Sequence, residues 1–154
     1  MARKLLLTNA KLLTPAWLVE SASHRLEWFK LDWPLSNRNI GRGHGFRSTH
    51  NERQRLETLV DQIALPSGAP YRDVVLVVCR VLGPREKLWD PDSVGRGNAK
   101  ELIDAMAACG WIEDDGPKHV RHVAYLQHNQ RPRPLRNSTI VQVWEGCGYT
   151  EVLI

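Results

Sequence analysis

The segment YRDVVLVVCRVL, residues 71–82, constrains the fold of this chain more than any other stretch. It is rich in β-branched residues and almost continuously apolar, so it lacks the alternation of a strand that has one face in water. This pattern predicts a central strand that is buried on both faces of a sheet. With 154 residues, the chain is long enough to bury such a core within one domain.

Three more segments have the composition of strands. Residues 24–33 combine aromatic side chains with a rough alternation, and Pro34 ends the segment. Residues 119–127 and 138–145 follow later in the chain, and the prolines between them keep their connection out of a sheet interior. All four segments are expected to join one sheet.

Two segments are expected to form helices. The first has an apolar stripe with the spacing i, i+3, i+4, i+7, formed by Leu56, Leu59, Val60 and Ile63. Ser48 or Thr49 could cap its start. Asn98 and Glu101 form a capping pattern ahead of the second helix, and Gly110 is positioned to end it. The order β-α-β-α-β-β predicts an α+β or mixed α/β domain, and we expect α+β, with a single mixed sheet and helices packed on it.

Positive and negative charges are separated along the chain, although the formal net charge is only +4. No Asp or Glu occurs between Gly116 and Trp144, and the basic tract from Arg38 to Arg55 is opposed only by Glu52. Two basic tracts that flank an acidic window indicate a polyanion held around a site that itself needs negative charge. The alternative is a set of scattered, solvated arginines with no common partner.

The cysteines and the apolar segments point to a reducing cytoplasm. Cys79, Cys109 and Cys147 are widely spaced and odd in number, so they indicate neither a disulfide framework nor a zinc site. Lys11 interrupts the apolar start of the chain, which is too short for the core of a signal peptide. No segment approaches the apolar length that spans a bilayer, so we expect a cytoplasmic protein without a membrane partner.

Much of the acid lies in residues 89–116, WDPDSVGRGNAKELIDAMAACGWIEDDG, which we call the acidic window. Asp90 and Asp92 flank Pro91 directly after the expected central strand, and residues i and i+2 of an extended segment point to the same side. Two carboxylates that close repel each other unless a cation neutralises them. Mg2+ and Mn2+ prefer oxygen ligands and would suit such a pair.

The rest of the acidic window adds a helix pair and an acidic turn. Lys100 and Asp104 are i, i+4 neighbours on the second expected helix, and Asp114 and Asp115 follow that helix. A lysine beside carboxylates can stabilise the developing charge of a phosphate or position a nucleophilic water. Taken one at a time, these features are more simply explained as a turn, a surface ion pair and a solvated helix exit.

Taken together, the window resembles the RusA-type Holliday-junction resolvases, small metal-dependent endonucleases common in phages and prophages. The matching stretches are Asp90-Pro-Asp92-Ser93, Lys100-Glu-Leu-Ile-Asp104-Ala105 and Ile112-Glu-Asp114-Asp115. Upstream, LDWPLSNRNIGRGH is similar to the family's early P-[PL]-S-x-N segment. The likeness covers roughly residues 26–145, so we expect an N-terminal extension over 1–25 and a RusA-like nuclease domain over 26–154. Ser93 and a longer spacer before Lys100 depart from the family pattern.

The resemblance implies a role for each matched residue. Asp90, Asp92 and Asp115 would be catalytic carboxylates that hold Mg2+ or Mn2+, and Lys100 and Asp104 would complete the catalytic set. It also implies a homodimer that cuts opposed strands of a four-way DNA junction, in a bacterial host cytoplasm if the chain is encoded by a phage or prophage.

The basic tracts would supply a salt-sensitive grip on the DNA backbone. The residues expected to bind DNA are Asn37, Arg38, Arg42, Arg47, Lys118, Arg121, Arg131, Arg133 and Arg136. Trp33 is the tryptophan best positioned to stack on a base. Two other functions stay open: a catalytically degenerate DNA-binding module, which Ser93 and the long spacer would suit, and a metal-dependent nuclease of different branched-substrate specificity.

Overall fold

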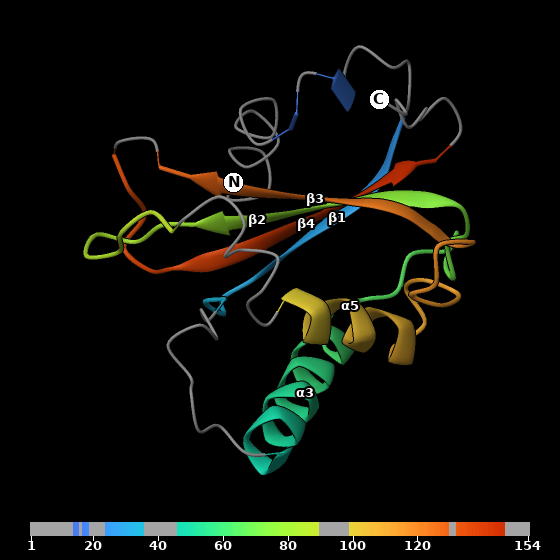
Figure 1. Cartoon of the computed structure of the whole chain (residues 1–154), viewed down its shortest axis with the longest axis horizontal. Coiled ribbons are helices and arrows are strands. Elements are labelled where there is room, and N and C mark those ends of the chain that lie inside the picture. Colours follow the sequence, from blue (N-terminus) through green and yellow to red (C-terminus); the bar gives the residue numbers. More distant parts are fainter. Residues whose placement is uncertain are drawn as a thin grey trace.

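Two helices cover one face of a four-stranded mixed sheet (Figure 1). The computed structural model describes residues 14–15, 17–18, 24–35, 46–89, 99–129 and 132–146. The strands are β1 (Arg25–Leu31), β2 (Val74–Val81), β3 (Val120–His128) and β4 (Ser138–Glu145), and the helices are α3 (Phe46–Asp61) and α5 (Ala99–Ala108). The predicted α+β class, element order and single mixed sheet are therefore confirmed.

β2 lies inside the sheet, whose strand order is β1-β4-β2-β3. It pairs in parallel with β3 and antiparallel with β4, and β4 pairs antiparallel with β1. Every residue of β2 is buried, which confirms the prediction of a central strand covered on both faces. An apolar run without alternation is what a strand in this position requires.

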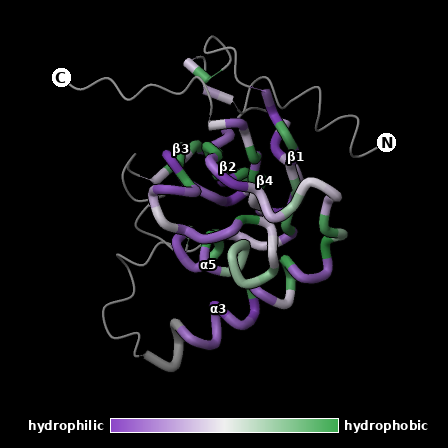
Figure 2. Tube along the Cα trace, turned by 90° about the vertical axis from the view of Figure 1, so that its right-hand side faces the viewer, coloured by the Kyte–Doolittle hydropathy of each residue, from purple (hydrophilic) through white to green (hydrophobic). Residues whose placement is uncertain are grey.

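The helices cover the face of β2 that carries Leu76 and Val78. α5 places Leu102 and Met106 against this face, and both side chains are fully buried. α3 packs on the far side of α5, as the view along the sheet shows (Figure 2). The apolar stripe predicted for α3 therefore faces the core, and its Leu56 is fully buried.

The opposite face of the sheet is covered in part by residues from the N-terminal region. Leu18 is fully buried in a cluster with Val75, Val77 and Trp144. The side-chain oxygen of Gln142 accepts hydrogen bonds from Thr14 Oγ1 and from Trp144 Nε1, each at 3.1 Å. The described residues before 25 therefore contribute to the core. No helix in the described ranges is long and apolar enough to cross a bilayer.

The starts of α3 and β2 differ most from the sequence-based prediction. α3 begins at Phe46, ahead of the expected cap at Ser48 or Thr49. β2 begins only at Val74, because Asp73 has a φ of 53° and interrupts the extended backbone.

α5 ends in a motif that requires glycine. The amide of Trp111 donates to the carbonyl of Met106 at 2.9 Å, and the amide of Gly110 donates to that of Ala107 at 3.3 Å. Gly110 has a φ of 84°, as expected for the residue that follows a helix in a Schellman motif. Trp111 then enters the core beside Met106, so the predicted stop at Gly110 is confirmed.

Replacing Gly110 tests this helix end. We expect Gly110→Ala to lower the free energy of unfolding by about 1–2 kcal/mol, because a Cβ is strained in the left-handed region. Gly110→Asn should lose less, since asparagine tolerates this conformation. Gly116→Ala is the control, because its φ is not in that region. Urea unfolding measures all three variants, and equal losses at both positions would contradict the assignment.

Candidate functional site

The acidic turn at Asp114 and Asp115 lies where β2 and β3 begin. The amide of Tyr71 donates to the carbonyl of Trp111 at 2.9 Å, and the amide of Glu113 donates to that of Tyr71 at 3.0 Å. Asp114 and Asp115 are both exposed, and the Asp114 carboxylate accepts the Asp115 amide at 2.8 Å. The turn is thus held at one end of the sheet.

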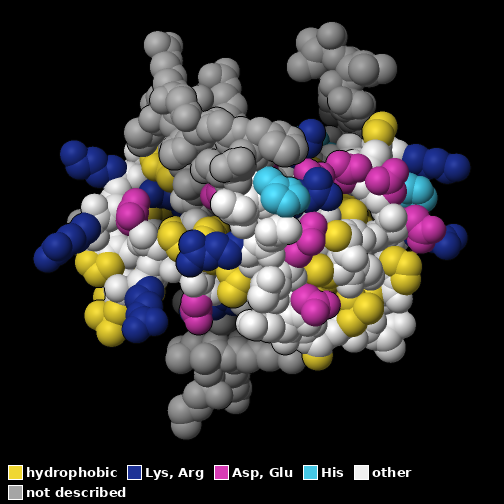
Figure 3. Space-filling model, turned by 90° about the horizontal axis from the view of Figure 1, so that it is seen from below, with side chains coloured by type: hydrophobic (Ala, Val, Ile, Leu, Met, Phe, Trp, Pro, Cys, Tyr) yellow, Lys and Arg dark blue, Asp and Glu magenta, His cyan; other side chains and the backbone are white. Residues whose placement is uncertain are grey.

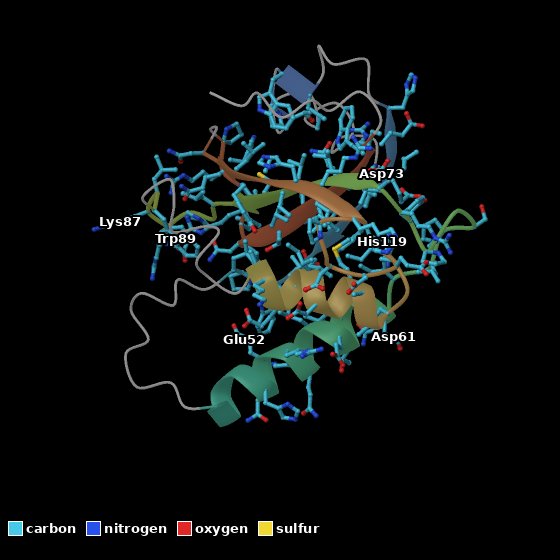
Figure 4. All side chains as sticks on the ribbon, turned by 45° about the vertical axis from the view of Figure 1, so that its right-hand side comes forward. Glu52, Asp61, Asp73, Lys87, Trp89 and His119 are labelled. Atoms are coloured by element: carbon cyan, nitrogen blue, oxygen red, sulfur yellow. The ribbon has the colours of Figure 1, made fainter. Side chains whose placement is uncertain are left out.

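Trp89 is held at the other end of the sheet, beside Gln127 of β3. Gln127 Oε1 accepts the Trp89 amide and Gln127 Nε2 donates to the Trp89 carbonyl, both at 2.9 Å. One side-chain amide thus binds the peptide groups on both sides of Trp89, as a neighbouring strand would. Figure 4 shows Trp89 at the opposite end of the sheet from Asp73 and His119.

The predicted metal ligands are therefore not gathered by the described part of the chain. Asp90 and Asp92 lie outside the described residues. From Val120 to Gln127, β3 covers about 23 Å at the usual rise per residue. The three residues from Trp89 to Asp92 reach at most about 10 Å. The structure does not bring the turn that carries Asp115 next to Trp89.

α5 separates the predicted catalytic lysine from Asp115. Lys100 is exposed in the first turn of the helix, and Asp104 is half-buried one turn later. The helix has 10 residues, and its length is about 15 Å. Lys100 and Asp115 therefore lie beyond each other's reach, near opposite ends of α5.

Glu101 is an acidic residue that the sequence reasoning treated only as part of a cap. It is 8 % exposed, in the same helical turn as Lys100. Ala105, four residues later on the same row of the helix, is also buried. In the sequence, the small apolar side chain of Ala105 is the signal that this side of α5, which includes Glu101, is buried.

A buried arginine organises the end of β2. Arg80 is 3 % exposed, and its guanidinium lies 3.8 Å from the ring centre of Trp89. It donates to Gln127 Oε1 at 2.9 Å and to the Lys87 carbonyl at 3.0 Å, and it pairs with Glu86 at 2.7 Å. Burial lowers the pKa of Arg80, and the Glu86 carboxylate acts in the opposite direction. Sequence reasoning did not single out Arg80, because it lies within an apolar strand.

Arg133, one of the residues expected to bind DNA, supports the same region. Its Nη1 donates to the carbonyls of Gly83 at 3.1 Å and Glu86 at 2.8 Å. Asn137 accepts the Gly83 amide and donates to the Glu86 carboxylate, both at 2.7 Å. These contacts tie the segments 83–89 and 132–137 together, so the structure assigns the Arg133 guanidinium a role in packing.

The other residues expected to bind DNA fall into four groups. Lys118 and Arg136 are exposed, whereas Arg121 forms an ion pair with Asp73, with Nη2 2.9 Å from Oδ2. Arg47 belongs to α3, in the part whose side chains are not described. Outside the described residues lie Asn37, Arg38, Arg42 and Arg131. Trp33, the candidate for base stacking, has the Arg55 guanidinium 4.8 Å from its ring centre, so that face is occupied.

Apart from the acidic window, the described side chains provide few groups that could hold a metal ion or act as a nucleophile. Within the described ranges, no three His, Cys, Asp or Glu side chains are arranged to hold a metal ion. Cys79 and Cys109 are not in disulfides, and burial raises the pKa of Cys79 to about 12. The Cys79 thiol therefore stays protonated at neutral pH and is no nucleophile. A divalent cation would depend on the carboxylates of the acidic window, which have the oxygen donors that Mg2+ prefers.

The contact between Gln127 and Trp89 can be tested by removing one amide. Gln127→Met keeps the shape of the side chain but loses both hydrogen bonds to the Trp89 backbone. We expect amide hydrogen exchange at Trp89 to become at least about tenfold faster, with a stability loss of about 2 kcal/mol. Gln142→Met is the matched control, since this buried glutamine lies on the opposite face of the sheet. Unchanged exchange in Gln127→Met, or equal acceleration in both variants, would contradict the assigned contact.

Comparison of the sequence with models of known protein families finds no matching family, and comparison with curated proteins finds no matching relative. The likeness to the RusA-type resolvases therefore rests on the motif residues alone.

Proposed function

We propose that this chain is a metal-dependent endonuclease that cuts branched DNA, with four-way junctions as its main substrate and Mg2+ or Mn2+ as its cofactor. The observation that carries the proposal is the anchoring of Trp89, one residue before Asp90, at the end of the central strands. Functional loops are commonly positioned in this way at strand ends. The chain is next described at α5, whose first turn carries Lys100.

The residues of the acidic window suit phosphodiester hydrolysis. A bound divalent cation would supply an activated water and offset negative charge on the phosphate. Asp90 and Asp92 would provide its oxygen ligands. Lys100 is exposed and would contact a phosphate oxygen, and Asp104, one turn further, would orient the lysine.

Asp115 requires a separate explanation, since its turn lies at the far end of α5. In a twofold dimer, a residue of one subunit can complete the site of the other. We include such a homodimer in the proposal, with Asp115 acting across the interface. Its near-twofold symmetry would also match that of a four-way junction.

A second candidate is a DNA-binding module without catalysis. The separation of Asp115 from Trp89 favours it, because a single subunit would then lack a third carboxylate at the site. This module would bind junctions through the same basic tracts and would not nick them.

Asp92→Asn separates the two candidates. The wild-type chain is expected to nick four-way junctions in Mg2+ and not in EDTA, and Asp92→Asn to reduce the rate at least about 1000-fold. Junction binding should be retained, because one carboxylate that repels DNA is removed. Asp61→Asn, at an exposed position at the end of α3, is the control. A wild-type chain that binds junctions but cleaves no DNA in a panel of junction, flap and duplex substrates would establish the binding module instead.

Mixed dimers test the role of Asp115. Asp92→Asn and Asp115→Asn are each expected to be inactive alone, whereas mixing them should restore nicking of one strand. In such a dimer, one site would receive the intact Asp92 of one subunit and the intact Asp115 of the other. Mixed dimers that stay inactive would place both residues in the same subunit's site. Full activity of Asp115→Asn alone would remove Asp115 from the proposal.

A further inference from the structure

The segments 83–89 and 132–137 together form a lobe at the end of the sheet where β2 and β3 finish. Figure 1 shows the two segments side by side at the left, and hydrogen bonds from Arg133 and Asn137 join them. The exposed side chains of the lobe are Arg85, Lys87, Leu88, Leu135 and Arg136. In the space-filling view, Lys and Arg lie beside apolar side chains at this end with few acidic groups among them, whereas acidic groups are denser towards the right-hand end (Figure 3).

The charge of the lobe is positive because its single acid is neutralised from inside. Glu86 is the only acidic residue in the two segments, and it pairs with the buried Arg80 at 2.7 Å. Arg85, Lys87 and Arg136 form no ion pair within the described part of the chain. Among the described residues, no acid therefore pairs with these three exposed cations, which lie at the end of the molecule that also carries Trp89.

The lobe also exposes two large apolar side chains on a rigid base. Leu135 is 91 % exposed and Leu88 is 55 % exposed, more than the other large apolar residues that the structure describes. A single exposed leucine needs no explanation. Here, however, Leu135 lies between Arg133 and Asn137, whose hydrogen bonds hold the neighbouring backbone in place. Its position resembles that of an apolar wedge rather than that of a side chain on a free loop.

We propose that this lobe docks on DNA beside the branch point. Arg85, Lys87 and Arg136 contact backbone phosphates, and Leu135 inserts at an unstacked base step next to the crossover. Proteins that bend or kink DNA insert leucine in this way while cations fix the backbone. The choice of branched DNA rests on the proposed function. The lobe itself is assigned from charge and exposure, so its binding can be measured without cleavage.

The cations are tested by the triple variant Arg85→Ser/Lys87→Ser/Arg136→Ser. Binding of a fluorescent four-way junction is measured in EDTA over a range of salt concentrations. We expect binding about 100-fold weaker at 0.1 M salt, and a log–log salt slope smaller by about 2–3. The control replaces three cations that each pair with a carboxylate, Lys30, Arg53 and Arg72, by serine. Equal effects of the two triple variants would overturn the assignment.

The wedge is tested by Leu135→Ser with 2-aminopurine placed at the branch point. The wild-type chain should raise the 2-aminopurine fluorescence, because insertion unstacks the base. Leu135→Ser should abolish this rise and weaken junction binding about tenfold, without changing the salt slope. Leu65→Ser, at a residue 50 % exposed, is the control. If Leu135→Ser instead alters only the oligomeric state in sedimentation, the lobe is a contact between copies and the proposal is wrong.

These measurements separate the lobe from the nuclease. Lobe-dependent junction binding by a chain that never cleaves would support the lobe and refute the nuclease. Metal-dependent cleavage with unchanged binding in the lobe variants would refute the lobe and leave the nuclease intact. A wild-type chain that prefers RNA, or binds no nucleic acid, would refute the docking of DNA on the lobe.

Discussion

Burial of β2 on both faces is the constraint on which the rest of the structure depends. Because each face must be covered, α5 packs on one and residues of the N-terminal region pack on the other. The same burial encloses Arg80 near the end of the strand. A charge there requires partners, and Glu86, Gln127 and the ring of Trp89 provide them. The contacts that compensate the buried charge of Arg80 therefore also hold the segment that leads to Asp90.

The parallel pair β2–β3 divides the acidic window between two ends of the molecule. A parallel connection must return the chain along the sheet, and α5 does this between Trp89 and the turn at Asp114 and Asp115. Lys100 consequently lies with the start of the helix and Asp115 beyond its end. These residues are close in the sequence and belong to one motif, whereas the crossover that joins the parallel strands keeps Lys100 and Asp115 apart in the folded chain.

The basic residues at this end of the sheet are divided between those that pack and those that are exposed. Arg80, at the end of β2, neutralises Glu86, and Arg133 binds the backbone carbonyls of Gly83 and Glu86. Arg85, Lys87 and Arg136 remain as the exposed charges of the lobe. A basic tract in the sequence thus contains two kinds of arginine, and only exposure and partners distinguish the kind that packs from the kind available to a phosphate.

Local sequence patterns were sufficient to predict the element order, the central position of β2, the apolar stripe of α3 and the helix stop at Gly110. Each of these depends on local periodicity or on a backbone conformation that only glycine adopts easily. The burial of Arg80, the binding of the Trp89 backbone by Gln127 and the joining of two distant segments by Arg133 became apparent only in the folded chain. Such contacts link residues far apart in the chain, and no local pattern of residue types records which polar group will meet which.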